Sequence, residues 1–339
     1  MMRMTSCGVA LALLPGLVSC TLAGSEKTAA SLTGEGPVTV AVAAEPRAAC
    51  TIVSDKRFAA GAETVRLARR DGLAPSANFA MFVAPLAVNT DGAPTSYHPR
   101  DFLGTSLAIN RIDNGVAIRK VGGGRTTVQE KIIAFDAWRD SDWTVPAGYS
   151  ITWKNVIAAD SAGKPCLFSS GQYAGYFGSL TALQNGLSGA AAGECQVANQ
   201  LDQRFIPAIV LRGNANPLKE HGAKTGDLVV AVNPATGTAV AAVIGDTGDG
   251  NRIGEGSVAL NMALLGRTDQ PRTYADALKL DTGRADMIVA VLPGSAGFER
   301  QRPYSAANIA ARVDAWAKAA GYGSTAGLAG AAEACSAGL

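Results

Sequence analysis

The sequence predicts a mainly β fold: a single β-barrel-like domain with a few peripheral α-helices. Short apolar segments bounded by Gly, Pro, Asn and Asp recur along the 339 residues, which is the pattern of short strands. The 39 glycines indicate many turns and argue against a helical bundle. No internal repeat is visible, so one continuous domain accounts for the pattern.

The predicted strands are residues 79–88, 115–121, 130–134, 148–157, 205–211, 227–232, 239–244 and 287–292. The pair 227–232 and 239–244 flanks the sequence NPATG at 233–237, whose Pro and Gly suit a five-residue hairpin turn. This hairpin is the clearest local prediction in the chain.

Helices are predicted at residues 256–265 and 305–320, with a short helical turn at 180–187. Ser257 is the candidate N-cap of the first helix. In the second helix Ile309, Val313 and Trp316 recur at three- and four-residue steps, which gives that helix one apolar face.

The N-terminus has the layout of a secretory signal. Arg3 precedes an apolar run at residues 9–18 that is too short to span a bilayer. The run ends in the sequence LVSC at 17–20, the pattern of a bacterial lipobox, which makes Cys20 the candidate lipid-modified residue. An ordinary signal cut near Ala23 is the alternative.

We therefore assign residues 1–19 to a signal peptide, 20–45 to a flexible tether and 46–339 to the folded domain, with its core at 79–297. This predicts an exported protein, in the periplasm or at the cell surface, that touches a membrane by its lipid anchor only.

Four cysteines remain once Cys7 and Cys20 are set aside, and in an oxidising compartment they predict two disulfides. Three pairings are open. We favour Cys166–Cys195, which closes a Gly- and Ala-rich loop, and Cys50–Cys335, which ties the two ends of the domain. No Cys-x-x-Cys spacing is present, which argues against a zinc or thioredoxin-like site.

Composition excludes several function classes. The chain has 30 basic and 28 acidic residues and no basic stripe, so nothing indicates nucleic acid binding. Two histidines exclude a zinc site built on three, and no Gly-x-Ser-x-Gly elbow indicates a serine hydrolase. The sequence predicts no metal and no redox or nucleotide cofactor.

The chemistry is concentrated in residues 245–257. Asp246 follows an apolar strand, Glu255 stands at a predicted helix start, and glycines flank both, leaving room for a large ligand. Two other readings stay open: the acidic loop forms Asx-type turns, or Asp246, Asp249, Asn251 and Glu255 hold calcium, although their spacing is not that of an EF-hand.

The hairpin, then GDTG at 245–248, then GEGS at 254–257 leading into a helix, resembles the core signature of the fungal-type chitosanases, glycoside hydrolase family 75. The sequences DGAP at 91–94 and SYHP at 96–99 resemble the earlier Asp-Gly motif of that family. The resemblance covers about residues 79–297. It implies that Asp246 and Glu255 are the catalytic pair.

The resemblance also implies an inverting mechanism, with the two carboxyl groups about 6.5–9.5 Å apart. We assign Glu255 as general acid and Asp246 as base; the reverse stays open, because a helix N-terminus favours the ionised form of Glu255. Asp91, Tyr97 and His98 are the predicted substrate-binding residues. Aromatic side chains that could stack on sugar rings are Tyr97, Trp143, Trp153 and Tyr173.

The predicted partner is a polysaccharide, chitosan or a related glucosamine glycan such as partly deacetylated peptidoglycan. Chitosan is a polycation, so its cleft should be locally acidic, and the candidate acids are Asp91, Asp101, Asp113, Asp136, Asp246, Asp249 and Glu255. The rival hypotheses are a non-catalytic lipoprotein that binds cell-wall glycan and a purely structural envelope lipoprotein.

Overall fold

The computed structural model describes residues 36–42, 49–58, 63–160, 162–186, 195–213, 215–248, 250 and 253–339. All of them belong to the second of the two units, Met1–Thr33 and Gly34–Leu339, into which the chain divides. The predicted signal peptide and Cys20 lie outside the described residues.

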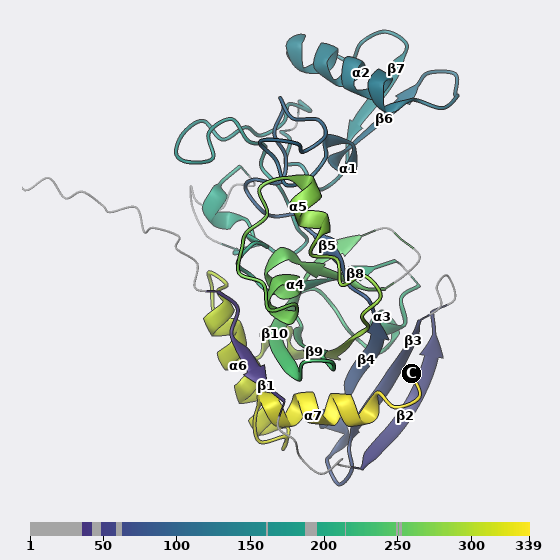
Figure 1. Ribbon diagram of the computed structural model, residues 1–339, viewed down its shortest axis with the longest axis vertical. Helices are drawn as coiled ribbons and strands as arrows, with labels where there is room; N and C mark the ends of the chain where they lie inside the picture. The colour runs from purple at the N-terminus through teal and green to yellow at the C-terminus, as the bar shows by residue number, and fades with distance from the viewer. Residues whose placement is uncertain are drawn as a thin grey trace, which may run out of the picture. The chain divides into compact units, whose positions relative to one another are not determined.

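The described strands form a ten-stranded mixed sheet and a separate two-stranded sheet (Figure 1). The large sheet runs in the order β2, β3, β4, β12, β9, β10, β8, β11, β5, and β1 pairs with β10. The strands of this sheet are β1 (Thr39–Ala41), β2 (Cys50–Arg57), β3 (Thr64–Arg70), β4 (Phe79–Ala84), β5 (Ala87–Asn89), β8 (Ala208–Arg212), β9 (Leu228–Asn233), β10 (Thr238–Gly248), β11 (Glu255–Ser257) and β12 (Met287–Leu292).

The fold is therefore mainly β with helices. Among the described pairings the strands at the two ends of the path, β2 and β5, do not pair with each other, so closure into a barrel is not shown. The small sheet consists of β6 (Val116–Lys120) and β7 (Tyr149–Trp153). Strand β1 lies inside the range predicted as tether and pairs with the first residues of β10.

Seven α-helices lie among the described residues: α1 (Ile112–Gly115), α2 (Val128–Asp140), α3 (Pro217–Glu220), α4 (Val258–Leu264), α5 (Tyr274–Leu278), α6 (Ala306–Ala319) and α7 (Thr325–Cys335). Short 3₁₀ turns occupy Pro75–Ala77, Val197–Asn199 and Ser295–Gly297.

The core lies on both faces of β9 and β12, whose residues are all buried. Successive side chains of a strand point to opposite faces. Val230 and Val232 accordingly share an apolar cluster with Ile309 of α6, whereas Val229 shares another with Leu260 of α4. Helices α6 and α7, drawn in yellow, lie together beside the sheet (Figure 1). The continuous apolar runs of β9 and β12 fit strands covered on both faces.

Residues 130–134 were predicted as a strand, and this was wrong, because they lie within α2. Thr127 accepts a hydrogen bond from the backbone N–H of Glu130, and the Glu130 carboxylate accepts one from the N–H of Thr127. This reciprocal capping box starts the helix and outweighs the short apolar run that suggested a strand. Residues 180–186 contain no helical turn either.

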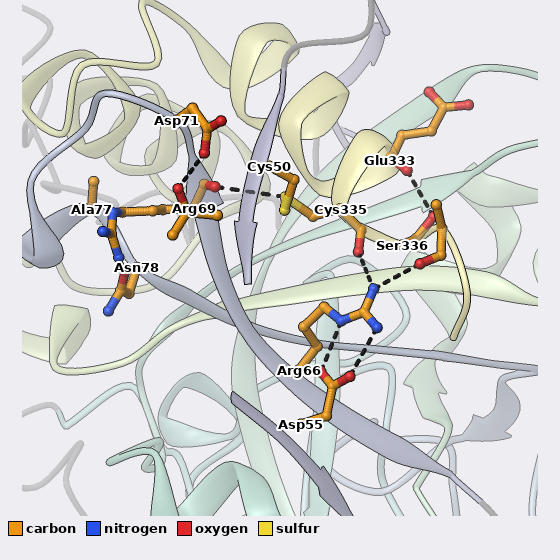
Figure 2. The surroundings of a disulfide bond; sticks show 12 residues. Cys50, Asp55, Arg66, Arg69, Asp71, Ala77, Asn78, Glu333, Cys335 and Ser336 are labelled. Carbon is orange, nitrogen blue, oxygen red and sulfur yellow. Dashed lines mark hydrogen bonds and ion pairs between the residues drawn. A yellow bond between two sulfur atoms is a disulfide. The ribbon is translucent and has the colours of Figure 1, made fainter. Parts of the chain in front are cut away.

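The structure forms the two disulfides that the sequence favoured, Cys50–Cys335 and Cys166–Cys195. Figure 2 shows the first, with Arg66 of β3 donating two hydrogen bonds to Asp55 and two to the backbone carbonyls of Cys335 and Ala337. The disulfide and Arg66 together fix the end of α7 to the first hairpin of the sheet. Two disulfides indicate an oxidising, exported environment.

Helices long and apolar enough for a bilayer span are absent from the described part of the chain.

Candidate active site

A pocket of 1170 Å³ opens where β5, β8, β10 and β11 meet the segment that follows β7. Three of the five residues predicted to catalyse or bind substrate line it: Asp91, Asp246 and Glu255. These three come from segments far apart in the sequence, and the large sheet brings them together.

A bulge in β10 sets the direction of Asp246. Ile244 pairs with Ile209 of β8, and Asp246 pairs with the next residue of β8, Val210, so Gly245 is the extra residue. Asp246 therefore faces the opposite side of the sheet from Ile244. A Cβ on Gly245 would lie 2.7 Å from the Cβ of Ala208, so the bulge requires glycine.

Strand β11 brings Glu255 to the other side of β8. Gly256 pairs with Ile209 in antiparallel register, so Glu255, one residue earlier, stands across from Val210, which also pairs with Asp246. Residues across from each other point to the same face of a sheet. Two strand spacings of about 4.8 Å put the two backbones about 10 Å apart, with one strand between the carboxylates.

The glycines beside Glu255 serve the packing of the chain itself. A Cβ on Gly254 would lie 2.3 Å from the carbonyl oxygen of Pro85, and one on Gly256 would lie 2.4 Å from Oδ1 of Asn261. These glycines were predicted to leave room for a ligand, but Pro85 and Asn261 of the chain itself occupy that space. Glu255 itself lies in β11, three residues before α4 begins, with Ser257 as the N-cap.

Asp246 is 5% exposed, and burial raises its pKa to about 6. The rise is limited because Oδ1 accepts hydrogen bonds from the backbone N–H groups of Ala182, at 2.9 Å, and Thr247, at 2.8 Å. The side-chain amide of Asn89 donates a longer bond of 3.4 Å to Oδ2. A carboxyl group with this pKa exchanges its proton near neutral pH.

Asp91 has a still higher pKa of about 8, raised first by burial and then by the negative charge of Asp246. The hydroxyl of Tyr97 donates a 2.6 Å hydrogen bond to Asp91 and accepts one of 3.0 Å from Asn110. Tyr97 is fully buried behind Asp91. It thus orients Asp91, and it is not among the residues that line the pocket.

His98 lies elsewhere. It lines a second pocket, of 460 Å³, together with Arg139, Trp143 and other residues, and its ring packs edge-on against Tyr176. Burial lowers the pKa of His98. The structure therefore separates His98 from Asp91 and Asp246, although the three were predicted to serve one cleft.

Three basic residues line the large pocket, and the sequence analysis did not identify them: Lys154, Arg212 and Lys219. Arg212 of β8 forms an ion pair with Glu255, with 3.1 Å between Nη1 and Oε2. Arg212 is two residues after Val210, so its side chain lies on the same face as both carboxylates. Strand periodicity could have found it once the strand order was known.

Of the candidate aromatic residues, Trp153 lines the pocket, and so does Tyr274, which the sequence analysis missed. Trp143 packs against Phe135 in a core of aromatic rings, and the hydroxyl of Tyr173 accepts a hydrogen bond from Arg204. Trp153 also packs against Trp138, with 4.4 Å between ring centroids, so only part of its ring faces the pocket. Trp153 and Tyr274 are the aromatic rings at the pocket wall that could contact a sugar.

The described residues do not form the acidic cleft that was expected for chitosan binding. Asp101 is bonded by a loop of backbone N–H groups, Asp113 pairs with Arg111, and Asp136 pairs with Arg139. None of these three lines the large pocket. Asp249 lies outside the described residues.

No group of three or more His, Cys, Asp or Glu in the described segments is placed to hold a metal ion. Two of the four calcium ligands considered above, Asp249 and Asn251, lie outside those segments.

A scan against protein-family models and a search of curated proteins found nothing that matches this chain.

Proposed function

We propose that this domain is a glycoside hydrolase of the chitosanase type, which cleaves β-1,4 bonds of a glucosamine-containing polysaccharide. The observation that carries this is the position of Asp246 and Glu255 on either side of β8, facing one pocket. Two strand spacings put the backbones of Asp246 and Glu255 about 10 Å apart, which leaves room between the side chains for the water that an inverting glycosidase uses. The motif resemblance is a second argument for the same pair.

The environments of the two groups favour Asp246 as the general acid, the assignment that the sequence analysis left open. Burial raises the pKa of Asp246 to about 6, so a useful fraction carries a proton near neutral pH. Glu255 contacts the guanidinium of Arg212, an interaction of the ionised carboxylate. We therefore assign Glu255 as the base.

In this mechanism Asp246 donates its proton to the glycosidic oxygen as the bond from that oxygen to the anomeric carbon breaks. Glu255 takes a proton from a water that attacks the anomeric carbon from the opposite face. Asp91, with a pKa of about 8, is neutral at neutral pH and adds no third negative charge beside the acid. Trp153 and Tyr274 hold the sugar rings.

The test is product release from partly acetylated chitosan and from purified peptidoglycan, with wild type compared with Asp246→Asn and Glu255→Gln. Glu333→Gln, an exposed change on α7, is the matched control. Loss of about 10²-fold or more in both variants, with folding intact, supports the mechanism. Activity that is absent from the wild type on both glycans, or unchanged in the variants, overturns it.

One observation favours a second function, a cell-wall glycan-binding lipoprotein without catalysis. Glu255 is engaged in an ion pair, which suits a carboxylate that fixes a ligand. A protein that binds glycan tightly and releases no product would fit this alternative. In both cases we propose a periplasmic or cell-surface protein anchored by a lipid on Cys20.

A further inference from the structure

The charges that line the large pocket are balanced in number. Among its described residues the carboxyl groups are Asp91, Asp246 and Glu255, and the basic groups are Lys154, Arg212 and Lys219. A groove for a polycation needs an excess of carboxylates, because a low-dielectric cleft concentrates the field of its charges. The equal numbers of acidic and basic residues therefore do not fit a groove that binds a polycation.

The three carboxyl groups also carry less total negative charge than three free carboxylates would. Glu255 is matched by Arg212 at 3.1 Å. Asp91 has a pKa of about 8, so it carries its proton at neutral pH. Asp246 is then the one remaining carboxylate without a basic partner among the described lining residues, and even it is partly protonated near pH 6.

The two lysines form no such ion pair, although the positive charge of Lys154 acts to lower the pKa of Asp91. The ammonium group of Lys154 donates a 2.9 Å hydrogen bond to a backbone carbonyl, that of Asp113. Neither Lys154 nor Lys219 forms an ion pair with a carboxylate in the described part of the chain. Lys219 lies on α3, whose N-cap is Asn216. Lys154 follows directly after β7. The two ammonium groups therefore come from different segments.

We propose that the pocket binds a glycan that carries carboxylate groups, with Lys154 and Lys219 as the residues that bind those groups. The proposal rests on the glycoside hydrolase function and names its substrate class. Two sources share this chemistry, the peptide-substituted glycan of a cell wall and a uronic-acid polysaccharide. Chitosan, with an ammonium group on each sugar, is disfavoured by the same two lysines.

The test measures binding of three β-1,4-linked glycans with matched backbones: glucosamine oligomer (cationic), N-acetylglucosamine oligomer (neutral) and carboxymethylated chitin oligomer (anionic). The full chain is mixed with each at about pH 6, where glucosamine is cationic. Stopped-flow tryptophan fluorescence gives Kd before turnover, because Trp153 lines the pocket. We expect the anionic oligomer to bind most tightly and to lose affinity as salt is added.

The variants Lys154→Gln and Lys219→Gln test the two residues, and Lys318→Gln on α6, an exposed lysine that does not line the pocket, is the matched control. The double variant should weaken binding of the anionic oligomer about threefold to tenfold. The control should change Kd by less than about twofold. Equal affinity for the three oligomers, or tightest binding of the cationic one, overturns the proposal.

Purified peptidoglycan and hyaluronan then separate the two sources. Tighter binding of either one than of the neutral oligomer supports the proposal, and tighter binding of neither overturns it. Binding of an anionic glycan without product release would leave this proposal standing and reject the hydrolase. Cleavage with a preference for glucosamine would do the reverse.

Discussion

Asp101 and Asp246 are both buried aspartates, each 5% exposed, and their pKa values move in opposite directions from the ordinary 3.8. Burial alone would raise both. At Asp101 four backbone N–H groups outweigh burial and lower the pKa to about 2; at Asp246 burial outweighs fewer donors and raises it to about 6.

The difference lies in the two backbones. The loop after Asp101 turns the N–H groups of residues 105–108 toward its carboxylate, with donor–acceptor distances of 2.7 to 3.0 Å. Asp246 stands at the end of a strand, where two backbone N–H groups reach one oxygen and a 3.4 Å amide bond reaches the other. A carboxylate with complete hydrogen bonding stabilises its loop, whereas an incompletely bonded one can exchange a proton.

The largest effect should separate the two aspartates by activity. Asp246→Asn should reduce product release by about 10²-fold or more, because the amide cannot donate the proton. Asp101→Asn should retain the activity of the folded fraction, because Asp101 does not line the pocket. Product release per folded molecule, with folding checked by circular dichroism, is the measurement. Similar losses of activity in both variants would contradict a specific catalytic role for Asp246.

The pH dependence of stability should show opposite signs. The raised pKa of Asp246 means that its contribution is fully present below about pH 4 and is lost as pH rises through about 6. The loss is on the order of 3 kcal/mol. The lowered pKa of Asp101 means that its contribution is present above about pH 4 and is lost as pH falls through about 2.

Urea unfolding from pH 2 to 7 measures both windows. Asp246→Asn should remove the loss between pH 4 and 6, and Asp101→Asn should remove the loss between pH 4 and 2. Curves for both variants that run parallel to the wild type would contradict these pKa directions.

At neutral pH, Asp101→Asn should destabilise the fold by about 2 kcal/mol, because the new amide N–H₂ group faces backbone donors that have lost a charged acceptor. The free energy of unfolding in urea at pH 7 is the measurement. Asp136→Asn, which removes a half-buried partner of Arg139, is the control and should change the free energy of unfolding by less than about 1 kcal/mol. An equal loss of unfolding free energy in both variants would show that the backbone N–H groups around Asp101 do not stabilise the fold.

The smallest effect should come from Asn89→Ala. The side-chain amide of Asn89 lowers the pKa of Asp246 through a 3.4 Å bond, so its removal should raise that pKa by about half a unit. The pH–rate profile reports the shift as a movement of the Asp246 limb toward higher pH. A shift toward lower pH would mean that Asn89 does not donate to Asp246.

Local patterns in the sequence were sufficient for much of the fold. The hairpin at 227–244 and strand β12 are confirmed, and the predicted last helix is confirmed as α6 within one residue at each end. Strands β2 and β3 were missed; β2, at the edge of the sheet, is largely polar and exposed and carries no apolar alternation.

The sequence by itself determined the four cysteines, left their three pairings open with one favoured, and singled out the candidate carboxylates Asp246 and Glu255, because cysteine counts, strand ends and motifs are readable along the chain. The structure shows the favoured pairing. The tertiary structure decided which groups share the pocket: Asp91, Lys154 and Arg212 join the two carboxylates, whereas His98 does not. The tertiary structure also decided the pKa values of the pocket carboxyl groups, and thus which of them carry a proton. Desolvation and charge–charge interactions depend on distances between segments, and those distances exist only once the strands are in order.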